Sequence, residues 1–194
     1  FSLISNTGGG YTFCKDARYR RITRYRYNNV PIDDGGKYFY INDGENIWSP
    51  GWKPCKTELD KYICRHGLNY TVITGAKNGL EVEILYMVPL HTWAEVQKVT
   101  LKNTTNQIKR FKVFSFVEWC LWNAQSDMEN FQRNLSLGEV EVENSILFHK
   151  TEYRERRNHY SYYSVNVPIN GFETDRESFL GMYNGFDQPQ AVTQ

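Results

Sequence analysis

The fold of this chain is decided by residues 70–88, YTVITGAKNGLEVEILYMV. β-Branched and aromatic residues, which favour an extended backbone, dominate residues 70–74. The pair Asn78-Gly79 is typical of a two-residue hairpin turn, because both residues tolerate positive φ. The returning stretch alternates strictly, with Val82, Ile84 and Tyr86 on one face and Glu81 and Glu83 on the other. We therefore predict a half-buried antiparallel hairpin.

Further short β-rich stretches lie on both sides of this hairpin. Tyr38 to Ile41 leads into the turn Asn42-Asp43-Gly44, and the next strand is expected from Ile47. Residues 139–143, EVEVE, predict a half-buried strand with one acidic face. Residues 160–167 predict a last strand of this series.

Two stretches have apolar residues that fit neither face alone. In residues 96–102 the apolar side chains are out of phase, which predicts a bulge or a strand covered on both sides. Residues 111–119 are apolar on both faces, so we expect a central strand of a two-layer structure.

These patterns together predict an all-β chain that forms a two-layer antiparallel β-sandwich. No stretch has convincing helical spacing, and residues 123–133 are interpreted as a loop with local helix. The length of 194 residues fits one domain spanning residues 1–194. Because the chain starts at Phe1 and residues 188–194 resemble a strand, we expect a sandwich that is incomplete at both ends.

Composition excludes several classes of protein. Lys and Arg total 23 against 22 Asp and Glu, so no global charge attracts nucleic acid or an acidic membrane surface. No apolar run is long enough for a membrane-spanning helix, and no signal peptide opens the chain. Cys14, Cys55, Cys64 and Cys120 lack zinc-type spacing and are interpreted as free thiols of a reducing compartment, which favours the cytoplasm.

Three motifs invite a functional interpretation that their context does not favour. The glycines of residues 6–11, NTGGGY, could cradle a phosphate, but the following Lys-Ser/Thr is missing, so a tight turn between strands is favoured. Residues 18–27, RYRRITRYRY, could bind single-stranded RNA, but a strand whose Arg side chains stack on Tyr rings or pair with acidic neighbours is favoured. Residues 152–159, EYRERRNH, lack a nucleophile and are interpreted as a solvated loop or a subunit interface.

No metal site is predicted, because His66, His91, His149 and His159 are scattered. The many carboxylates show no spacing that identifies an acid and base pair. On the residues alone, the chain is an aromatic-rich β-sandwich without a recognisable catalytic centre.

Several segments, in order, resemble the cellobiose phosphorylase family (glycoside hydrolase family 94, formerly glycosyltransferase family 36). They are ISN at 4–6 with GGY at 9–11, RITRYRYNNVP at 21–31, WSPGW at 48–52, CRHGL at 64–68 with YT at 70–71, VPL at 88–90, FSFVE at 114–118, TEYRERRNHY at 151–160 and TDRESFLG at 174–181. The likeness spans the chain and looks closest to the cellobiose-cleaving members. Gly8 and Thr12 depart from the family pattern, where Ala and Ser are expected.

The resemblance implies a galactose mutarotase-like supersandwich at the N-terminus of an inverting phosphorylase. Such an enzyme is a cytoplasmic homodimer that converts cellobiose and inorganic phosphate into α-glucose 1-phosphate and glucose, with no other cofactor. Phosphate takes the place of the activated water of an inverting glycosidase, so one carboxyl group suffices, as the general acid. The resemblance implies that this carboxyl group lies in a downstream α/α-barrel domain, so this chain by itself is expected to be inactive.

The resemblance also implies that a sandwich loop approaches the active-site mouth of the other subunit. By position that loop is residues 119–133, and Trp122, Asn123, Asp127 and Asn130 are its candidate acceptor-site residues. A purely structural dimer contact is an equally good interpretation of this loop. A stand-alone carbohydrate-binding module is the alternative for the whole chain, and saturable binding of cellodextrins by the isolated chain would favour it.

Overall fold

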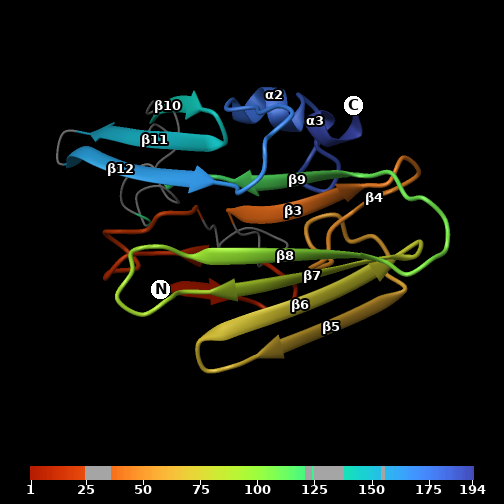
Figure 1. The fold of residues 1–194 in the computed structure, drawn as a ribbon. Coiled ribbons are helices and arrows are strands. Elements are labelled where there is room, and N and C mark those ends of the chain that lie inside the picture. Colours follow the sequence, from red (N-terminus) through yellow and green to blue (C-terminus); the bar gives the residue numbers. More distant parts are fainter. Residues whose placement is uncertain (25–35, 121–123, 125–137, 154–155) are drawn as a thin grey trace.

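A computed structural model describes residues 1–24, 36–120, 124, 138–153 and 156–194 (Figure 1). Nearly all its regular structure is antiparallel β, in four sheets with strand orders β1-β2, β4-β3-β9, β5-β6-β7-β8 and β10-β11-β12. The strands are β1 (Ser2–Ile4), β2 (Gly10–Thr12), β3 (Lys37–Asn42), β4 (Ile47–Trp48), β5 (Lys61–His66), β6 (Tyr70–Lys77), β7 (Leu80–Met87), β8 (Val96–Asn103), β9 (Lys112–Val117), β10 (Gly138–Glu143), β11 (Ile146–Tyr153) and β12 (Arg156–Ser164). Two short helices follow, α2 (Arg176–Leu180) and α3 (Gln190–Thr193).

The predicted hairpin of residues 70–88 is confirmed as β6 and β7. The two strands pair from Tyr70↔Met87 to Lys77↔Leu80. Asn78 and Gly79 occupy the turn with φ of 51° and 77°, as a primed two-residue turn requires. Burial along β7 alternates as the sequence predicts, since Val82 and Ile84 are buried and Glu83 is exposed. The hairpin therefore presents one apolar face to the rest of the molecule.

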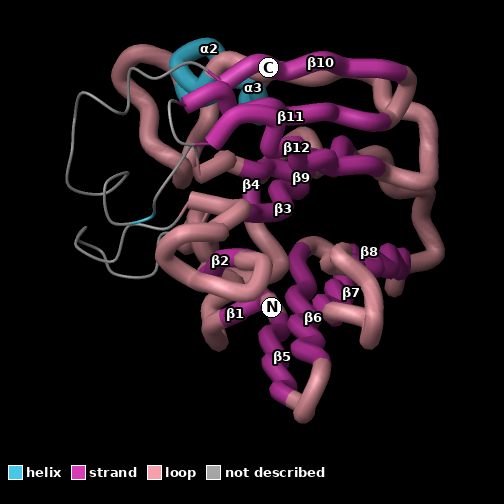
Figure 2. Tube along the Cα trace, turned by 90° about the vertical axis from the view of Figure 1, so that its left-hand side faces the viewer, coloured by secondary structure: helices cyan, strands magenta, loops and turns pink. Residues whose placement is uncertain are grey.

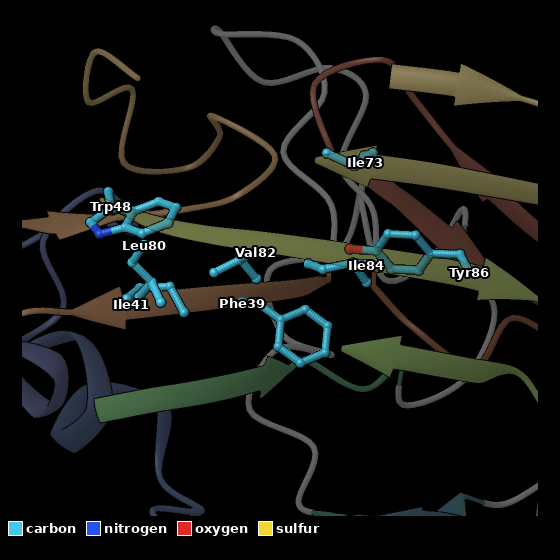
Figure 3. Packing of buried hydrophobic residues seen from close by; sticks show 8 residues of the cluster. All are labelled: Phe39, Ile41, Trp48, Ile73, Leu80, Val82, Ile84 and Tyr86. Atoms are coloured by element: carbon cyan, nitrogen blue, oxygen red, sulfur yellow. The ribbon is translucent and has the colours of Figure 1, made fainter. Parts of the chain in front are cut away.

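The main core lies between this hairpin and the sheet β4-β3-β9, as Figure 3 shows. Trp48, Ile73 and Val82 have no exposed surface, and each such large apolar side chain stabilises the fold by about 1.5–3 kcal/mol. The buried members come from both layers: Phe39, Ile41, Trp48, Ile73, Leu80, Val82, Ile84 and Tyr86. The chain is thus the two-layer antiparallel β-sandwich that the sequence predicts.

A second core covers the other face of β3. Tyr38 and Tyr40 point away from the first core and pack against Phe179 and Leu180 of α2 and Val192 of α3. The phenol ring of Tyr38 stacks on Phe116 of β9, with the centroids 6.2 Å apart. Because both faces of β3 are covered, five of its six residues are buried.

The predicted turn and strand pair around residues 38–48 and the strand at 139–143 are also confirmed. β3 and β4 pair through Ile41↔Trp48. In β10 the exposed Glu139, Glu141 and Glu143 alternate with half-buried residues. β12 ends at Ser164, three residues before the predicted end. Figure 2 shows the sheet β10-β11-β12 stacked at one end of the molecule.

The predictions for residues 96–102 and 111–119 were wrong. β8 pairs with β7 in a continuous register without a bulge, and Val96 and Leu101 are about two-fifths exposed (41% and 42%) because β8 is an edge strand. β9 is not central: among the described residues its one strand partner is β3. Its aromatic face is covered by the α2 and α3 region instead of a further sheet, which explains why both of its faces carry apolar residues.

Three local predictions were also wrong. Residues 188–194 contain helix α3 and no strand, because a single turn after Pro189 is enough to bury Val192 against β3. Residues 18–24 form turns and isolated bridges in place of the predicted strand. Residues 152–153 and 156–159 are strand and not loop, because β11 and β12 pair with each other as far as Tyr153↔Arg156.

Candidate functional site

The four residues expected at the acceptor entrance, Trp122, Asn123, Asp127 and Asn130, lie outside the described residues. The structure does describe how the chain is held immediately before them. Glu118, Trp119 and Cys120 follow β9 and make contacts with three other parts of the chain. We call Glu118, Trp119 and Cys120 the loop root.

Glu118 joins two points of the chain through its backbone. Its N–H donates to the carbonyl oxygen of Gly36 at 2.7 Å, and its carbonyl oxygen accepts from the N–H of Arg24 at 2.8 Å. Gly36 is packed so closely that a Cβ atom there would lie 2.3 Å from the carbonyl oxygen of Arg24. Arg24 and Gly36 are the residues on either side of residues 25–35, so both ends of that segment are fixed at Glu118.

The Glu118 carboxylate also holds two arginines. Its Oε1 atom lies 2.9 Å from Nη1 of Arg24 and 3.2 Å from Nε of Arg176. The first pair is largely buried, whereas Arg176 is half exposed at the start of α2. Asp175 caps this helix by accepting from the backbone N–H of Ser178 at 2.7 Å, and that bond lowers the pKa of Asp175. The ion cluster therefore ties helix α2 to the loop root.

Trp119 and Cys120 are fixed by the N-terminal part of the chain and by β11. Trp119 forms an isolated bridge with Thr23, and its indole stacks on His149, with ring centroids 5.2 Å apart and planes 7° apart. The Cys120 N–H donates to the carbonyl oxygen of Ile22 at 2.9 Å. Burial lowers the pKa of His149 to about 4, so this imidazole is neutral at pH 7. The stack is therefore an uncharged aromatic contact.

A second cluster, inside the sandwich, is the most strongly buried set of charged residues that the structure describes. The Lys37 ammonium lies 2.7 and 2.8 Å from the two oxygens of Glu95 and also donates to the hydroxyls of Ser2 and Thr12. Burial lowers the pKa of Lys37, although Glu95 opposes the shift. Burial alone raises the pKa of Glu95, but the Lys37 charge and hydrogen bonds outweigh it and lower the pKa overall. These contacts join β1, β2 and β3 to the segment before β8.

Cys64 and His66 on β5 resemble a nucleophile and its base in geometry. The Cys64 Sγ lies 3.4 Å from Nε2 of His66, and Nδ1 of that ring lies 3.0 Å from the Thr71 hydroxyl. Burial raises the pKa of the Cys64 thiol, whereas an activated nucleophile needs a lowered one. The arrangement therefore does not support covalent catalysis.

The glycine-rich motif forms the turn between β1 and β2, as predicted. The backbone N–H of Ser5 donates to Gly9 and that of Gly8 donates to Ser5. These amides serve the turn and do not converge on an open anion site. The predicted stacking of arginines on tyrosines is confirmed for Arg21 over Tyr11, at 3.9 Å, and for Arg18 over Tyr19, at 5.0 Å.

Within residues 1–24, 36–120, 124, 138–153 and 156–194, no three His, Cys, Asp or Glu side chains are grouped closely enough to ligate a metal ion. In the same part of the chain, no helix is long and apolar enough to cross a membrane.

Sequence reasoning missed the residues that organise both clusters. Lys37 and Glu95 are 58 positions apart, and Glu118 and Arg176 are also 58 positions apart, so no local spacing signals either contact. One signal was available for helix α2, because Asp175 is a preferred N-cap residue and Glu177 places an acidic side chain in the first turn.

Comparison with known proteins identifies the chain. The model of the glycosyl hydrolase 94 supersandwich domain matches residues 1–194. The chain is 31% identical over 198 residues to N,N'-diacetylchitobiose phosphorylase of Vibrio proteolyticus. The aligned region covers 100% of the chain and 25% of the relative. It is 33% identical over 164 residues to solabiose phosphorylase of Paenibacillus borealis, which covers 82% of the chain and 21% of the relative.

The chain spans about a quarter of the length of these curated relatives. Their names refer to different disaccharides and do not single out cellobiose. The family model and the full-length match to the Vibrio relative agree with the antiparallel sandwich described above. The chain therefore belongs to the glycosyl hydrolase 94 family and matches its supersandwich domain over residues 1–194.

Proposed function

We propose that this chain is part of an enzyme that splits a β-linked disaccharide with inorganic phosphate and inverts the anomeric centre. The observation that carries the proposal is the match of the supersandwich family model to residues 1–194. In such a reaction phosphate attacks the anomeric carbon while one carboxylic acid protonates the leaving oxygen. We assign that acid to a downstream α/α-barrel domain, so residues 1–194 by themselves turn over no substrate.

Cellobiose is the proposed substrate, with α-glucose 1-phosphate and glucose as products. The likeness of the overall sequence pattern to the cellobiose-cleaving members of the family supports this choice. N,N'-diacetylchitobiose and solabiose are the competing substrates, because phosphorylases named for them are among the relatives. Inorganic phosphate is the co-substrate, and no other cofactor is required. We place the enzyme in the cytoplasm, as a homodimer.

The first experiment measures phosphorolysis by the full-length protein. Cellobiose, N,N'-diacetylchitobiose and solabiose are supplied separately, with and without inorganic phosphate, and the sugar 1-phosphate is quantified. We expect product from cellobiose only when phosphate is present. Cleavage at the same rate without phosphate contradicts phosphorolysis, and a preference for another disaccharide contradicts the substrate assignment.

The sandwich contributes a scaffold, a dimer contact and the acceptor-site entrance of the partner subunit. Trp122, Asn123, Asp127 and Asn130 are the proposed entrance residues. An aromatic ring suits the apolar face of a sugar, and amide and carboxylate groups suit its hydroxyls. What supports this role is the loop root, since Glu118, Trp119 and Cys120 hold the chain firmly just before these positions.

The second experiment replaces Trp122 and Asn130 by Ala in the full-length enzyme. In the direction of synthesis, we expect a higher KM for the acceptor sugar with little change in KM for the sugar phosphate. Trp93→Ala is the matched control, because Trp93 is a 74% exposed tryptophan on another loop. Unchanged acceptor KM together with an unchanged dimer in sedimentation contradicts the entrance role.

A further inference from the structure

The sheet β10-β11-β12 has one face that lines up aromatic and acidic residues in rows. The three strands pair antiparallel in a continuous register up to Thr151. Residues opposite one another across neighbouring strands share a face, so each row crosses the sheet. Two such rows carry these aromatic and acidic residues. From β10 through β11 to β12, one row consists of Glu139, Lys150 and Tyr160, and the other of Glu141, Phe148 and Tyr162.

These rows point away from the body of the protein. The residues that alternate with them are more covered, since His149 is 5% exposed and Tyr163 is half-buried. In contrast, Tyr160 and Tyr162 are 64% and 63% exposed. Two tyrosine rings thus stand side by side on β12, about 6–7 Å apart along the strand.

The acidic side of the face lies two strands away from the tyrosines, a distance of about 10 Å. Glu139 and Glu141 on β10 are exposed. On the middle strand β11, Nζ of Lys150 lies 3.6 Å from Oε2 of Glu139. Carboxylates accept hydrogen bonds from hydroxyl groups, and the lysine ammonium donates them. The face therefore combines two aromatic rings, which can stack on sugar rings, with hydrogen-bonding side chains. The carboxylates and the ammonium group lie on the neighbouring strands, at least the width of one sugar ring from the tyrosines.

This chemistry selects one kind of occupant. The exposed glutamates of β10 disfavour a nucleic acid or other polyanion along that strand. The central part of a protein interface is depleted of charged residues, whereas charged side chains form one whole side of this face. A neutral β-linked glucan fits, because its extended chain is flat, its ring faces are apolar and its edges carry hydroxyls. We propose that the outer face of β10-β11-β12 is a binding surface for β-glucan chains, with Tyr160 and Tyr162 as its stacking platform.

The surface continues past the end of the sheet. A shallow depression there is lined by Asn144 and Ser145 of the β10–β11 turn and by residues 165–169 after β12. The two chain segments are held together by the Ser145 hydroxyl, which donates to the Val167 carbonyl oxygen at 2.9 Å. The side-chain amides of Asn144 and Asn166 add both donors and acceptors for hydroxyl groups. A glucan longer than a disaccharide can therefore reach beyond the two tyrosines.

This inference goes beyond phosphorolysis, because it concerns binding without bond cleavage. It is tested with the full-length protein by native gel electrophoresis in gels that contain hydroxyethylcellulose, a soluble β-glucan. We expect the protein to be retarded in that gel and not in one that contains soluble starch, whose α-linked chain coils. Tyr162→Ala should weaken retardation about fivefold, because one lost aromatic contact is worth about 1 kcal/mol and a tenfold change needs about 1.4 kcal/mol. Tyr162→Phe, which keeps the ring, should retain most of it.

Tyr183→Ala is the matched control, because Tyr183 is a 93% exposed tyrosine that belongs to none of β10, β11 and β12. The glucan-binding inference is overturned if the wild type is not retarded by hydroxyethylcellulose. It is also overturned if Tyr160→Ala and Tyr162→Ala leave retardation unchanged, or if they only convert a dimer to a monomer. Phosphorolysis of cellobiose, measured in parallel, should be unchanged in both variants, so that failure of this inference is separable from failure of the proposed reaction.

Discussion

The ammonium group of Lys37 lies within 2.8 Å of both carboxylate oxygens of Glu95, and the side chains are only 3% and 8% exposed. Both charges are removed from water, and each is satisfied by additional hydroxyl or amide partners. An ion pair buried in this way costs little only while it is complete, because removal of one partner leaves an uncompensated charge.

Lys37→Met should therefore be strongly destabilising. We expect the free energy of unfolding to fall by about 3–5 kcal/mol, because the Glu95 carboxylate stays buried without its counter-ion. Urea unfolding followed by tryptophan fluorescence measures the loss. The double variant Lys37→Met with Glu95→Leu should regain a large part of it, since apolar replacement of both partners removes the buried charge. A single variant as stable as the wild type contradicts the prediction.

His149 should make stability depend on pH between about 6.5 and 4. Its pKa in the folded chain is about 4, so the unfolded chain, with an ordinary pKa near 6.5, takes up the proton first. The contribution of His149 to the free energy of unfolding is therefore fully present above pH 6.5. Below that pH the free energy of unfolding falls by at most about 1.4 kcal/mol for each pH unit, and the loss levels off near pH 4. The midpoint of urea unfolding, measured at several pH values, follows this loss of stability.

His149→Phe keeps the stack on Trp119 and removes the titrating group, so its stability profile should be flatter over that range. His91→Asn is the matched control, because His91 is exposed and its positive φ of 60° suits Asn. If His149→Phe and the wild type lose stability in parallel as pH falls, another group is responsible.

Gly36→Ala should disturb the loop root through the backbone. The added Cβ atom would lie 2.3 Å from the carbonyl oxygen of Arg24 and 2.8 Å from that of Glu118, and neither backbone atom can move aside cheaply. We expect a loss of at least about 1–3 kcal/mol, the usual cost of overpacking. Gly171→Ala is the control, because a Cβ atom there meets nothing within 4 Å. Equal melting temperatures for the two variants contradict the expectation.

The cysteines should differ in reactivity toward iodoacetamide. Burial, with a further contribution from Asp187, raises the pKa of Cys55 to about 12. Since the thiolate is the reacting form, Cys55 should be alkylated about a thousandfold more slowly at pH 8 than an ordinary thiol. Peptide mass spectrometry over time measures each site, with the half-exposed Cys14 as internal reference. Equal labelling of Cys14 and Cys55 in the folded protein contradicts this ranking.

The sequence predicts the parts of this fold that are encoded locally. The β6–β7 hairpin follows from Asn78-Gly79 and from strict alternation in β7, and the acidic face of β10 follows from the same alternation. The terminal helix α3 does not follow, because one turn of helix is too short for a periodic signal. Its Val192 is buried by Tyr38 and Tyr40, which lie about 150 positions earlier in the chain.

The candidate site is harder to predict from the sequence, because its contacts join segments that are distant in the chain. Glu118 meets Arg24 across 94 positions and Arg176 across 58, and side-chain pairing at such separations has no local pattern. Trp122, Asn123, Asp127 and Asn130 stay predictions. What the structure adds is the way Glu118, Trp119 and Cys120 are held just before them.

The fixation of Arg24 and Gly36 on Glu118 has a consequence for protein engineering. When the two ends of a segment are clamped side by side on the scaffold, the stretch between them can be exchanged for one of another length without altering the attachment points. Doubling the length of a flexible insert costs only about 0.6 kcal/mol in closure entropy. An exchange of sequence between family members at this place should therefore keep the arginine, the glycine and the glutamate of the clamp.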